Sequence, residues 1–370
     1  MLSKNRAQSI LFVNPDYHCT FFYKQELDKL EWRADILVLD SYPDKYLYDA
    51  KKVFKTYKIT SKSYINYFFW ILCNIFKYKY IVFYGKPKDF GSFFPKSGIE
   101  PLLAIIKFFR TKIVYLPAGC NDEFTKKEFI KFDFGNVCGN CGFFDKCNDK
   151  INERNLQIIN RYAHLIISSG FTKPQIKNQK IIKWKSFDLD AFNPNIKVPN
   201  SYLFPKSNKF KILHSASLEG RDFNGKNIKG SHYISAAVER LIGEGFNCEL
   251  IRTTDVDSVN MKYIQVQSDL IIDQLIYGHW GSTSLEGIAL GKPVICYFNK
   301  EWKENYIDAL NIQVWPFIEA DTYSIYTVLR NLLINPDELK RYSEMSLDFA
   351  HKYLDIKVNA KEFIEVLGKL

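Results

Sequence analysis

Short apolar runs alternate with helical patterns along most of this 370-residue chain, and the alternation restricts the fold more than any other feature. Runs such as SILFV at Ser9–Val13 and KIVYL at Lys112–Leu116 have the length and β-branched content of buried strands. Strand, helix and strand in repeated order predict an α/β fold with parallel sheets covered by helices. The predicted strands are Ser9–Val13, Asp35–Leu39, Tyr80–Tyr84, Lys112–Leu116, Leu165–Ser168, Lys180–Trp184, Phe210–His214, Asn247–Arg252, Leu270–Asp273, Pro293–Tyr297 and Val314–Ile318. The predicted helices are Tyr64–Phe76, Pro101–Phe109, Asn155–Tyr162, Ser231–Glu244 and Ser284–Leu290.

One segment, Asn193–Lys209, interrupts this alternation. It holds three prolines together with Asn, Ser and Lys residues and has no periodicity, which is typical of a linker. The chain is also longer than one core usually fills, so two α/β domains are expected. We predict an N-terminal domain over 1–200, a C-terminal domain over 201–354, and a last helix over 355–370 that packs back on the N-terminal domain. Parallel sheets of this kind bind ligands at the carboxyl ends of their strands.

Basic residues are concentrated in the first third of the chain. The formal net charge is +10, and Met1–Gly119 contains 19 Lys and Arg against 10 Asp and Glu, a net +9. Such a surface attracts phosphates, anionic lipid head groups or nucleic acid, or is simply solvated. No apolar run reaches the roughly 20 residues of a membrane helix, and the N-terminus has no cleavage-site pattern. We therefore predict a cytoplasmic protein.

The segment Ser268–Tyr297 has the features of an anion-binding turn. A predicted strand ends at Asp273, a loop of small residues follows over Gly278–Ser284, and a helix begins there. The predicted helix caps are Ser282, Thr283 or Ser284. Free backbone N–H groups and the helix dipole favour an anion at such a position, and a diphosphate fits it. Glu286 in the first turn either accepts hydrogen bonds from sugar or ribose hydroxyls or only complements the dipole.

A second segment, Ile212–Val238, carries the cations that such chemistry needs. A strand ends at His214, and the polar loop after it holds Arg221, Lys226 and Lys229 before the next helix. Two cations would offset the charge that develops on a leaving nucleoside diphosphate. Arg221 and Lys226 are equally compatible with an ordinary exposed loop.

The loop and helix around LEGIALGKPVI resemble the signature of glycosyltransferase family 4, which has the GT-B fold. In that family a Glu, seven residues and a second Glu precede the A-x-G-x-P-V-I pattern. Glu286 matches the second Glu, which binds the ribose of the nucleotide. The first Glu falls at Gly278 in this chain, so Asp273 or His279 substitutes for it, or the donor sugar is held differently.

The Ile212–Val238 segment is similar to the family's "G-R, loop, K-G" motif, whose Arg and Lys clamp the donor diphosphate. Lys229 before Gly230 matches the Lys, Arg221 is the corresponding Arg, and Lys226 is the reserve candidate. The stretch Tyr162–Pro194 resembles the end of the family's N-terminal domain, so the D-x-D pattern within it is interpreted as a turn. At the N-terminal strand ends the candidates are His18 for catalysis and Asn121 and Asp122 for the acceptor.

The resemblance implies two Rossmann-like domains whose parallel sheets face each other across a cleft. It implies a hexosyltransferase-type enzyme that retains the anomeric configuration and needs no metal for its chemistry. The expected substrates are a nucleotide-sugar donor and a glycan or lipid-linked acceptor, in bacterial capsule, lipopolysaccharide or other surface polysaccharide synthesis. The basic first third would then dock peripherally on the inner face of the cytoplasmic membrane, and no nucleic acid is expected as a partner.

Four of the eight cysteines are close enough in the sequence to suggest a metal site. Cys138, Cys141 and Cys147 form C-x2-C-x5-C, and Cys120 at a strand end would complete four sulfurs. Four thiolates suit structural zinc, or less well an iron–sulfur cluster. A C-x-x-C disulfide and free thiols are the alternatives. The site is predicted as an insertion of the N-terminal domain near 120–150.

Two rival functions are compatible with parts of this pattern. A sugar-nucleotide epimerase shares the GT-B architecture and would need no acceptor. A metal- or nucleic-acid-binding module would use the cysteines and the basic face, and would predict strongly salt-dependent binding to RNA or DNA. The second rival leaves Glu286 and the Lys229-Gly230 pair unexplained.

Overall fold

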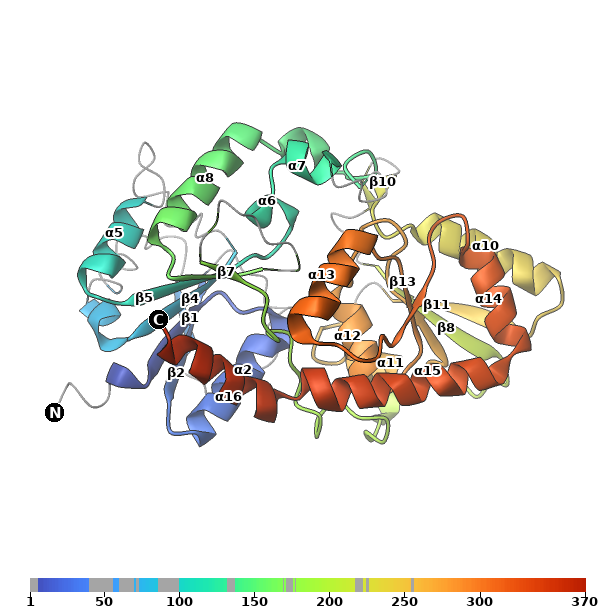
Figure 1. The fold of residues 1–370 in the computed structure, drawn as a ribbon. Helices are drawn as coiled ribbons and strands as arrows, with labels where there is room; N and C mark the ends of the chain where they lie inside the picture. The colour runs from blue at the N-terminus through green and yellow to red at the C-terminus, as the bar shows by residue number, and fades with distance from the viewer. Residues whose placement is uncertain are drawn as a thin grey trace. The chain divides into compact units, whose positions relative to one another are not determined.

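The chain forms two α/β units, each of which has its own parallel sheet (Figure 1). The structure is a computed structural model, and it describes residues 6–39, 56–59, 70, 73–85, 100–131, 137–168, 170, 176, 178–216, 222–223, 226–253 and 256–370. Unit 1 comprises Met1–Thr125, Asn148–Ser186 and Ile356–Leu370, and unit 2 comprises Lys126–Cys147 and Phe187–Asp355. The prediction of an α/β fold with two parallel sheets is confirmed.

The sheet of unit 1 has the order β3-β2-β1-β4-β5-β6-β7, and its strands pair in parallel. Its strands are β1 (Ser9–Val13), β2 (Arg33–Leu39), β3 (Thr56–Ile59), β4 (Tyr80–Tyr84), β5 (Lys112–Leu116), β6 (Leu165–Ile167) and β7 (Gln179–Lys180). The central strands are almost wholly buried apolar residues, as expected for a sheet covered on both faces. The first strand along the chain therefore occupies the middle of the sheet.

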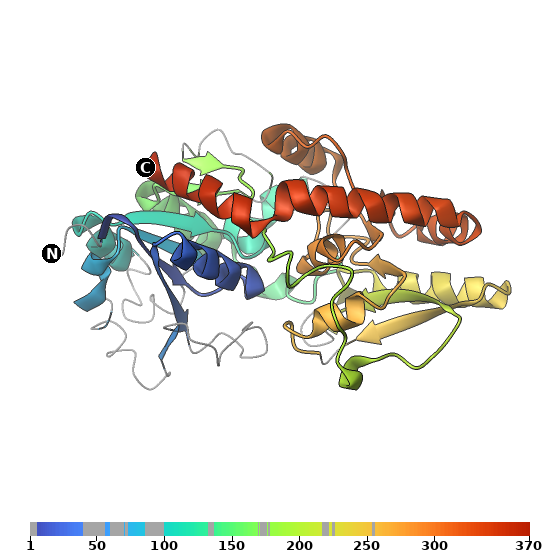
Figure 2. The ribbon, with the colours of Figure 1, turned by 90° about the horizontal axis from the view of Figure 1, so that it is seen from below.

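Helices cover this sheet, and one of them comes from the far end of the sequence. The helices and short turns of helix are α2 (Tyr17–Lys29), η3 (Ile75–Lys77), α5 (Glu100–Phe108), α6 (Cys120–Glu123), α8 (Asp149–Tyr162) and α16 (Ile356–Gly368). Figure 2 shows red α16 lying along blue α2. The ring of Phe363 on α16 packs edge-on against Tyr23 and Trp184, each at 5.3 Å between ring centroids. The C-terminal helix thus completes the core of unit 1.

The sheet of unit 2 has the order β11-β8-β12-β13-β14 and is also parallel. Its strands are β8 (Phe210–Ser215), β11 (Cys248–Thr253), β12 (Leu270–Ile272), β13 (Val294–Cys296) and β14 (Phe317–Glu319), with a separate hairpin of β9 (Asp222–Phe223) and β10 (Lys226–Asn227). The helices are α7 (Lys126–Lys131), η4 (Phe144–Lys146), η5 (Asn200–Tyr202), α10 (Ser231–Gly243), α11 (Met261–Gln265), α12 (Ser282–Ala289), α13 (Lys300–Leu310), α14 (Ile325–Ile334), α15 (Pro336–Phe349) and the π-helical turn η6 (Ala350–Leu354). Its core lies between the sheet and α10 and α14.

Helix α12 lies unusually close to this sheet because of a glycine in its middle. A Cβ atom at Gly287 would lie 2.8 Å from Cδ1 of Ile271 and 2.9 Å from Cγ2 of Val294. Real Cβ contacts of that length do not occur, so a side chain at this position would push the helix away from β12 and β13. The glycine therefore sets the distance between α12 and the strands β12 and β13.

Several predicted elements differ from those observed. Lys180–Trp184 was expected as a strand, but the chain leaves the sheet after β7, because Trp184 turns inward and donates its indole N–H to buried Asp16 at 2.8 Å. Strand β3 and the β9–β10 hairpin were not predicted. The predicted helix Tyr64–Phe76 falls largely outside the described residues. Among the helices that are described, none is both long enough and apolar enough to span a bilayer.

Candidate active site

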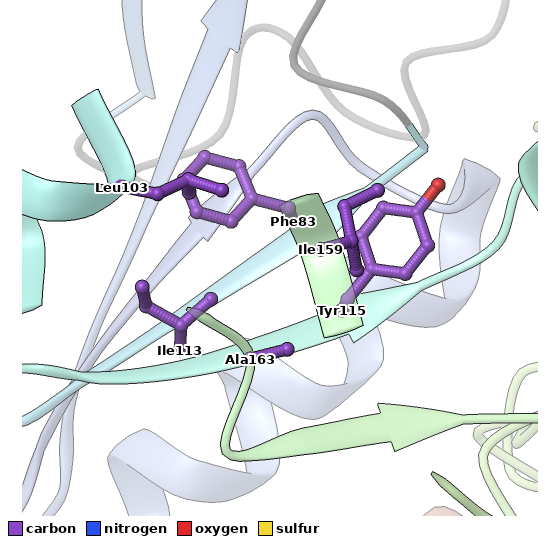
Figure 3. Close-up of a pocket in the computed structure, with 6 residues that line it drawn as sticks. All are labelled: Phe83, Leu103, Ile113, Tyr115, Ile159 and Ala163. Carbon is purple, nitrogen blue, oxygen red and sulfur yellow. The ribbon is translucent and has the colours of Figure 1, made fainter. Parts of the chain in front are cut away.

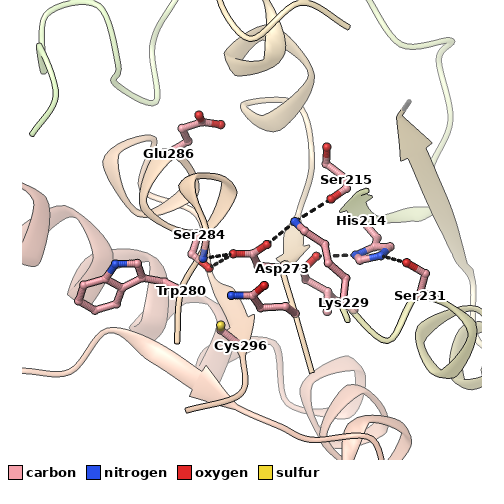
Figure 4. A network of polar contacts seen from close by, with 12 residues as sticks. His214, Ser215, Lys229, Ser231, Asp273, Trp280, Ser284, Glu286 and Cys296 are labelled. Carbon is pink, nitrogen blue, oxygen red and sulfur yellow. Dashed lines mark hydrogen bonds and ion pairs between the residues drawn. The ribbon is translucent and has the colours of Figure 1, made fainter. Parts of the chain in front are cut away.

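The candidate site of unit 2 lies where β8 and β12 end side by side. In the parallel register Ile272 of β12 is opposite His214 of β8, so Ser215 and Asp273 follow at the same edge of the sheet. The loop that leads into α10 brings Lys229 to this edge (Figure 4). Three segments that are distant in the sequence therefore meet at the carboxyl ends of two neighbouring strands, where such sheets bind ligands.

Lys229 is held there by two hydrogen bonds. Its Nζ lies 2.6 Å from Oδ1 of Asp273 and 3.0 Å from the carbonyl oxygen of Ser215. The side chain of Lys229 is 5% exposed and that of Asp273 is completely buried. An ammonium group has three N–H donors, and no further acceptor for the third one is found among the residues that the structure describes. Within the described part of the chain, one N–H donor of Lys229 therefore has no acceptor.

Asp273 links Lys229 to the start of α12. Its other oxygen, Oδ2, accepts hydrogen bonds from the backbone N–H of Gly281 at 2.6 Å and from Oγ of Ser284 at 2.7 Å. Burial alone would raise the pKa of Asp273, but the charge of Lys229 and these hydrogen bonds outweigh it and lower the pKa to about 2. A Cβ atom at Gly281 would lie 2.8 Å from Oδ2. Only glycine therefore allows the carboxylate to reach this amide.

The start of α12 differs from the prediction. The helix was expected to be capped by Ser282, Thr283 or Ser284, but the N-cap residue is Gly281, and it makes no side-chain cap. The carboxylate of Asp273 fixes this start, because it accepts from the backbone N–H of Gly281 and holds the hydroxyl of Ser284 away from a capping role. Ser284 is buried against that carboxylate, whereas Ser282 and Thr283 are half-buried at the open end of the helix. The backbone N–H groups of Ser282 and Thr283 have no acceptor among the described residues.

Glu286 is fixed by a partner that the sequence did not reveal. Its Oε2 accepts a hydrogen bond of 2.6 Å from Nε2 of Gln265, at the end of α11, and its side chain lies 6% exposed on α12. Gln265 is fully buried, and within the described part of the chain its Oε1 has no hydrogen-bond partner. Because the amide donates, Glu286 is held as an acceptor, which is the state that binds hydroxyl groups.

A chain of hydrogen bonds also fixes the backbone around Lys229. Nδ1 of His214 lies 2.9 Å from the carbonyl oxygen of Ile272, so Nδ1 carries the proton and Nε2 accepts from Oγ of Ser231 at 2.7 Å. Nδ2 of Asn227 donates to Ser231 Oγ at 3.1 Å, and the amide of Lys229 donates to Oδ1 of Asn227 at 2.8 Å. The histidine therefore links β12 and the loop before α10 in its neutral form.

This histidine makes the stability of the protein depend on pH. Burial first, and then the charge of Lys229, lower the pKa of His214 from 6.5 to about 4. Between these values the unfolded chain binds a proton that the folded chain does not, so stability falls as the pH drops from 6.5 to 4. The free energy of unfolding should fall by on the order of 3 kcal/mol over this range in the wild type. His214→Gln should lack this decrease, because glutamine does not bind a proton. Chemical denaturation across that pH range measures it, with His164→Gln as the comparison, because the pKa of His164 is also lowered to about 4.

The remaining donor-side candidates are His279, Arg221 and Lys226, and only the first has a described side chain. His279 stacks on Trp302 at 5.3 Å, meets Tyr277 edge-on at 4.5 Å, and its Nδ1 lies 2.8 Å from the carbonyl oxygen of Trp280. It therefore helps to hold the loop before α12 within an aromatic cluster. Arg221 lies outside the described residues, and for Lys226 the structure describes only the backbone, in β10.

In unit 1 the predicted acceptor-side residues lie after β1 and β5. His18 is buried in the first turn of α2, beside the ring of Phe22 at 5.5 Å. Asp122 is buried in α6, and its Oδ2 accepts from the amide of Ala118 at 3.0 Å. Asn121 is in α6, where only its backbone is described.

The loop after β1 also contains a buried carboxylate that the sequence did not single out. Asp16 is completely buried and accepts from Trp184 Nε1 at 2.8 Å and from Lys185 Nζ at 2.7 Å. Two residues next to it, Asn14 and Tyr17, have positive φ angles of 59° and 46°. Conformations of this kind are uncommon for residues other than glycine and persist only where surrounding contacts enforce them.

The cysteines do not form the predicted metal site. Within the described ranges, no group of three or more His, Cys, Asp or Glu side chains is arranged to hold a metal ion. Local turn contacts involve two of the sulfurs: Sγ of Cys141 accepts from the amide of Phe143 at 3.4 Å, and Sγ of Cys147 lies 3.6 Å from the carbonyl oxygen of Phe143. Cys120, Cys138, Cys141 and Cys147 are half-buried and are not joined in disulfides.

A small cavity in unit 1 is a packing gap rather than a binding site. It lies between the sheet and helices α5 and α8 (Figure 3). Its lining is apolar apart from one tyrosine: Phe83, Leu103, Ile113, Tyr115, Ile159 and Ala163. No charged group faces it, so it offers nothing that would orient a polar substrate.

Comparison with known proteins supports the architecture. No protein-family model matches the sequence, and no curated protein matches it. The solved structures that match almost the whole chain include sucrose-phosphate synthase from Thermosynechococcus elongatus (TM-score 0.63, 12% identity, 98% of each chain), an alpha-glucosyltransferase in complex with UDP-glucose and DNA containing an abasic site (0.59, 11%, 97% of this chain and 98% of that one), and a glycosyltransferase from Rickettsia africae (0.54, 12%, 98% of each chain). At these identities the likeness establishes the fold alone, and that fold is GT-B.

Proposed function

We propose that this chain is a nucleotide-sugar-dependent glycosyltransferase whose donor binds at the strand ends of unit 2. The observation that carries the proposal is the position of Lys229, which Asp273 fixes beside the first turn of α12, with one N–H donor that meets no acceptor among the described residues. The amides of Ser282 and Thr283 and the positive end of the helix dipole lie at the open end of the same helix. A diphosphate is the ligand that this combination suits best.

The charges of the site indicate that Lys229 does not act alone. Its ammonium is paired with Asp273, so the two side chains together contribute no net charge, and Glu286 adds a negative one. A nucleoside diphosphate therefore needs at least one more cation to offset the charge on its leaving group. We assign this role to Arg221, with Lys226 as the second candidate. Both precede Lys229 in the sequence between β8 and α10.

Glu286 is proposed to bind the ribose hydroxyls of the donor. The hydrogen bond from Gln265 holds it as an acceptor on α12, beyond the first turn in which the sequence placed it. Gly278 stands where the resembling family carries its first glutamate, and Asp273 is enclosed by three donors. Asp273 is therefore proposed to act through Lys229 rather than on the donor sugar. His279 remains the side chain of this loop that is best placed to replace the missing glutamate.

The reaction is proposed to retain the anomeric configuration without a metal ion in the chemistry. The alpha-glucosyltransferase that shares this fold was solved with UDP-glucose, so UDP-sugars are the first donors to test. A glycan or lipid-linked saccharide of a bacterial surface polysaccharide is the proposed acceptor. His18, Asn121 and Asp122 are the proposed acceptor-side residues, and the protein is proposed to work in the cytoplasm, peripherally at the membrane.

A thermal-shift screen with UDP-, GDP-, ADP- and CMP-sugars tests the donor first. We expect one nucleotide to raise the melting temperature of the wild type and to have no such effect on Glu286→Ala or Lys229→Ala. Product analysis with the donor alone then separates transfer from epimerisation, because an epimerase changes the sugar without an acceptor. If no nucleotide sugar stabilises the wild type, the proposal is wrong.

A further inference from the structure

The surface of unit 1 carries two exposed phenylalanines that no core explains. Phe108, the last residue of α5, is 82% exposed, and Phe76 in η3 is 40% exposed. Phe109 joins them, with ring centroids 5.4 Å from Phe108 and 6.5 Å from Phe76. We call these rings and the cations among them the aromatic–basic patch; its members are Phe76, Lys77, Lys107, Phe108, Phe109 and Arg110.

The patch is built on a rigid base. Nη2 of Arg6 donates to the carbonyl oxygen of Phe109 at 2.5 Å, and its Nε donates to that of Tyr78 at 3.4 Å. Oγ1 of Thr111 donates to the same Tyr78 carbonyl at 3.0 Å. These bonds tie the end of η3 to the end of α5, so the rings keep their relative positions although they are about 30 residues apart in the sequence. The patch is therefore a preformed surface rather than two unrelated loop tips.

The charge of the patch is entirely positive. The segments Ile75–Lys79 and Lys107–Lys112 together hold five Lys and Arg residues and no Asp or Glu. Lys107 and Arg110 are exposed, and Lys77 is half-buried. These positive charges also affect nearby His164: burial first, and then the charges of Lys112 and Lys107, lower its pKa to about 4. Exposed rings surrounded by cations suit a partner that is both apolar and anionic.

We propose that the aromatic–basic patch docks this protein on a lipid bilayer with anionic head groups. Phenylalanine rings enter the boundary between head groups and acyl chains, while Lys and Arg extend their charges to the lipid phosphates. A second copy of the chain is disfavoured as the occupant, because the same five positive charges would face one another. A nucleic acid is disfavoured as well, since Phe108 and Phe109 meet edge-on, at 82°, and do not form a flat stacking platform.

The position of the patch is compatible with substrate binding elsewhere on unit 1. η3 and the end of α5 immediately precede β4 and β5, so the patch lies at the amino ends of these strands (Figure 1). Docking there leaves the carboxyl ends of the strands uncovered, which is where a parallel sheet binds its ligands. The docking does not depend on the transfer reaction, so each proposal can fail without the other.

Vesicle sedimentation tests the docking. The wild type is expected to bind vesicles of phosphatidylglycerol and phosphatidylcholine at low salt, and to bind phosphatidylcholine vesicles at least about tenfold more weakly. Phe76→Ser with Phe108→Ser should weaken binding by about tenfold or more at any salt concentration. Lys107→Glu with Arg110→Glu should weaken it mainly at low salt, because salt screens only the charges.

Matched controls come from unit 2. Tyr323 is 93% exposed and Lys340 is exposed, so Tyr323→Ser and Lys340→Glu remove an equally accessible ring and an equally accessible charge and should leave vesicle binding unchanged. Wild-type protein that does not sediment with anionic vesicles would overturn the proposal. So would patch variants that bind like the wild type, a dimer that Phe108→Ser dissolves, or DNA binding that the patch variants lose while no vesicle binding is found.

Discussion

Replacing Lys229 by methionine is expected to lower kcat by at least about a hundredfold, because the variant loses the donor that we propose for the leaving diphosphate. The same change should lower the free energy of unfolding by about 3–5 kcal/mol, since Asp273 is completely buried and would keep a charge without its partner. Activity is measured as turnover of the nucleotide sugar found by the thermal-shift screen. Stability is measured by chemical denaturation.

A double variant separates these two losses. Lys229→Met with Asp273→Asn removes both charges, so most of the stability should return while kcat stays low. If activity returns along with stability, Lys229 is only structural and its proposed role is wrong. Lys292→Met is the matched control, because Lys292 is a half-buried lysine of the same unit that precedes β13, at the opposite edge of the sheet.

The pH dependence of the single variant gives a further check. In the wild type the pKa of Asp273 is about 2, below its usual 3.8, so its stabilising contribution is present above pH 3.8 and is lost as the pH falls through 2. Without Lys229 burial raises this pKa instead, and protonation relieves the buried charge. The stability difference between Lys229→Met and the wild type should therefore shrink as the pH is lowered towards 4.

The second large effect is expected at Glu286. Glu286→Gln should raise the KM for the nucleotide sugar by about 10- to 100-fold, since hydrogen bonds to a charged acceptor contribute about 1.5–3 kcal/mol. The new amide can still accept from Gln265, so the fold should be retained. The KM is measured at a saturating acceptor concentration, with Glu338→Gln, on an exposed glutamate of α15, as the control.

Gln265→Leu tests whether the buried amide positions this glutamate. The leucine keeps the volume but cannot donate, so KM should rise by a smaller factor than in Glu286→Gln while kcat changes little. Combining the two changes should add little to Glu286→Gln alone, because both act on one interaction. A full additive loss would show that Gln265 acts independently of Glu286.

The strands could be predicted because their signal is local. SILFV, YIVFY and KIVYL are buried strands over the predicted residues, as continuous apolar runs in a covered parallel sheet should be. The strand predicted at Lys180–Trp184 is shorter than expected, because an edge strand pairs with only one neighbour. Burial of Trp184 against Asp16 outweighs further pairing with β6. The two residues are 168 positions apart, so no local pattern could reveal their contact.

The candidate site divides in the same way. Lys229 and Glu286 were readable because each lies within a short motif beside a strand or at a helix start. Gln265 was not, because its only signal is a hydrogen bond to a residue 21 positions later, on another helix. The start of α12 differs from the prediction for a related reason, since Asp273 at the preceding strand end accepts from the backbone N–H of Gly281 and from the hydroxyl of Ser284.

The discontinuous make-up of unit 1 has a consequence for how the protein is made. On the ribosome, every residue of unit 2 has been synthesised by Asp355, before α16 of unit 1 exists. Until Ile356–Gly368 emerges, the nascent chain lacks Phe363, and the rings of Tyr23 and Trp184 lack the face that it covers. The core of unit 1 therefore cannot be completed until the end of synthesis, although unit 1 begins the sequence. A premature stop before Ile356 would leave a finished second unit and a first unit with part of its core exposed to chaperones and proteases.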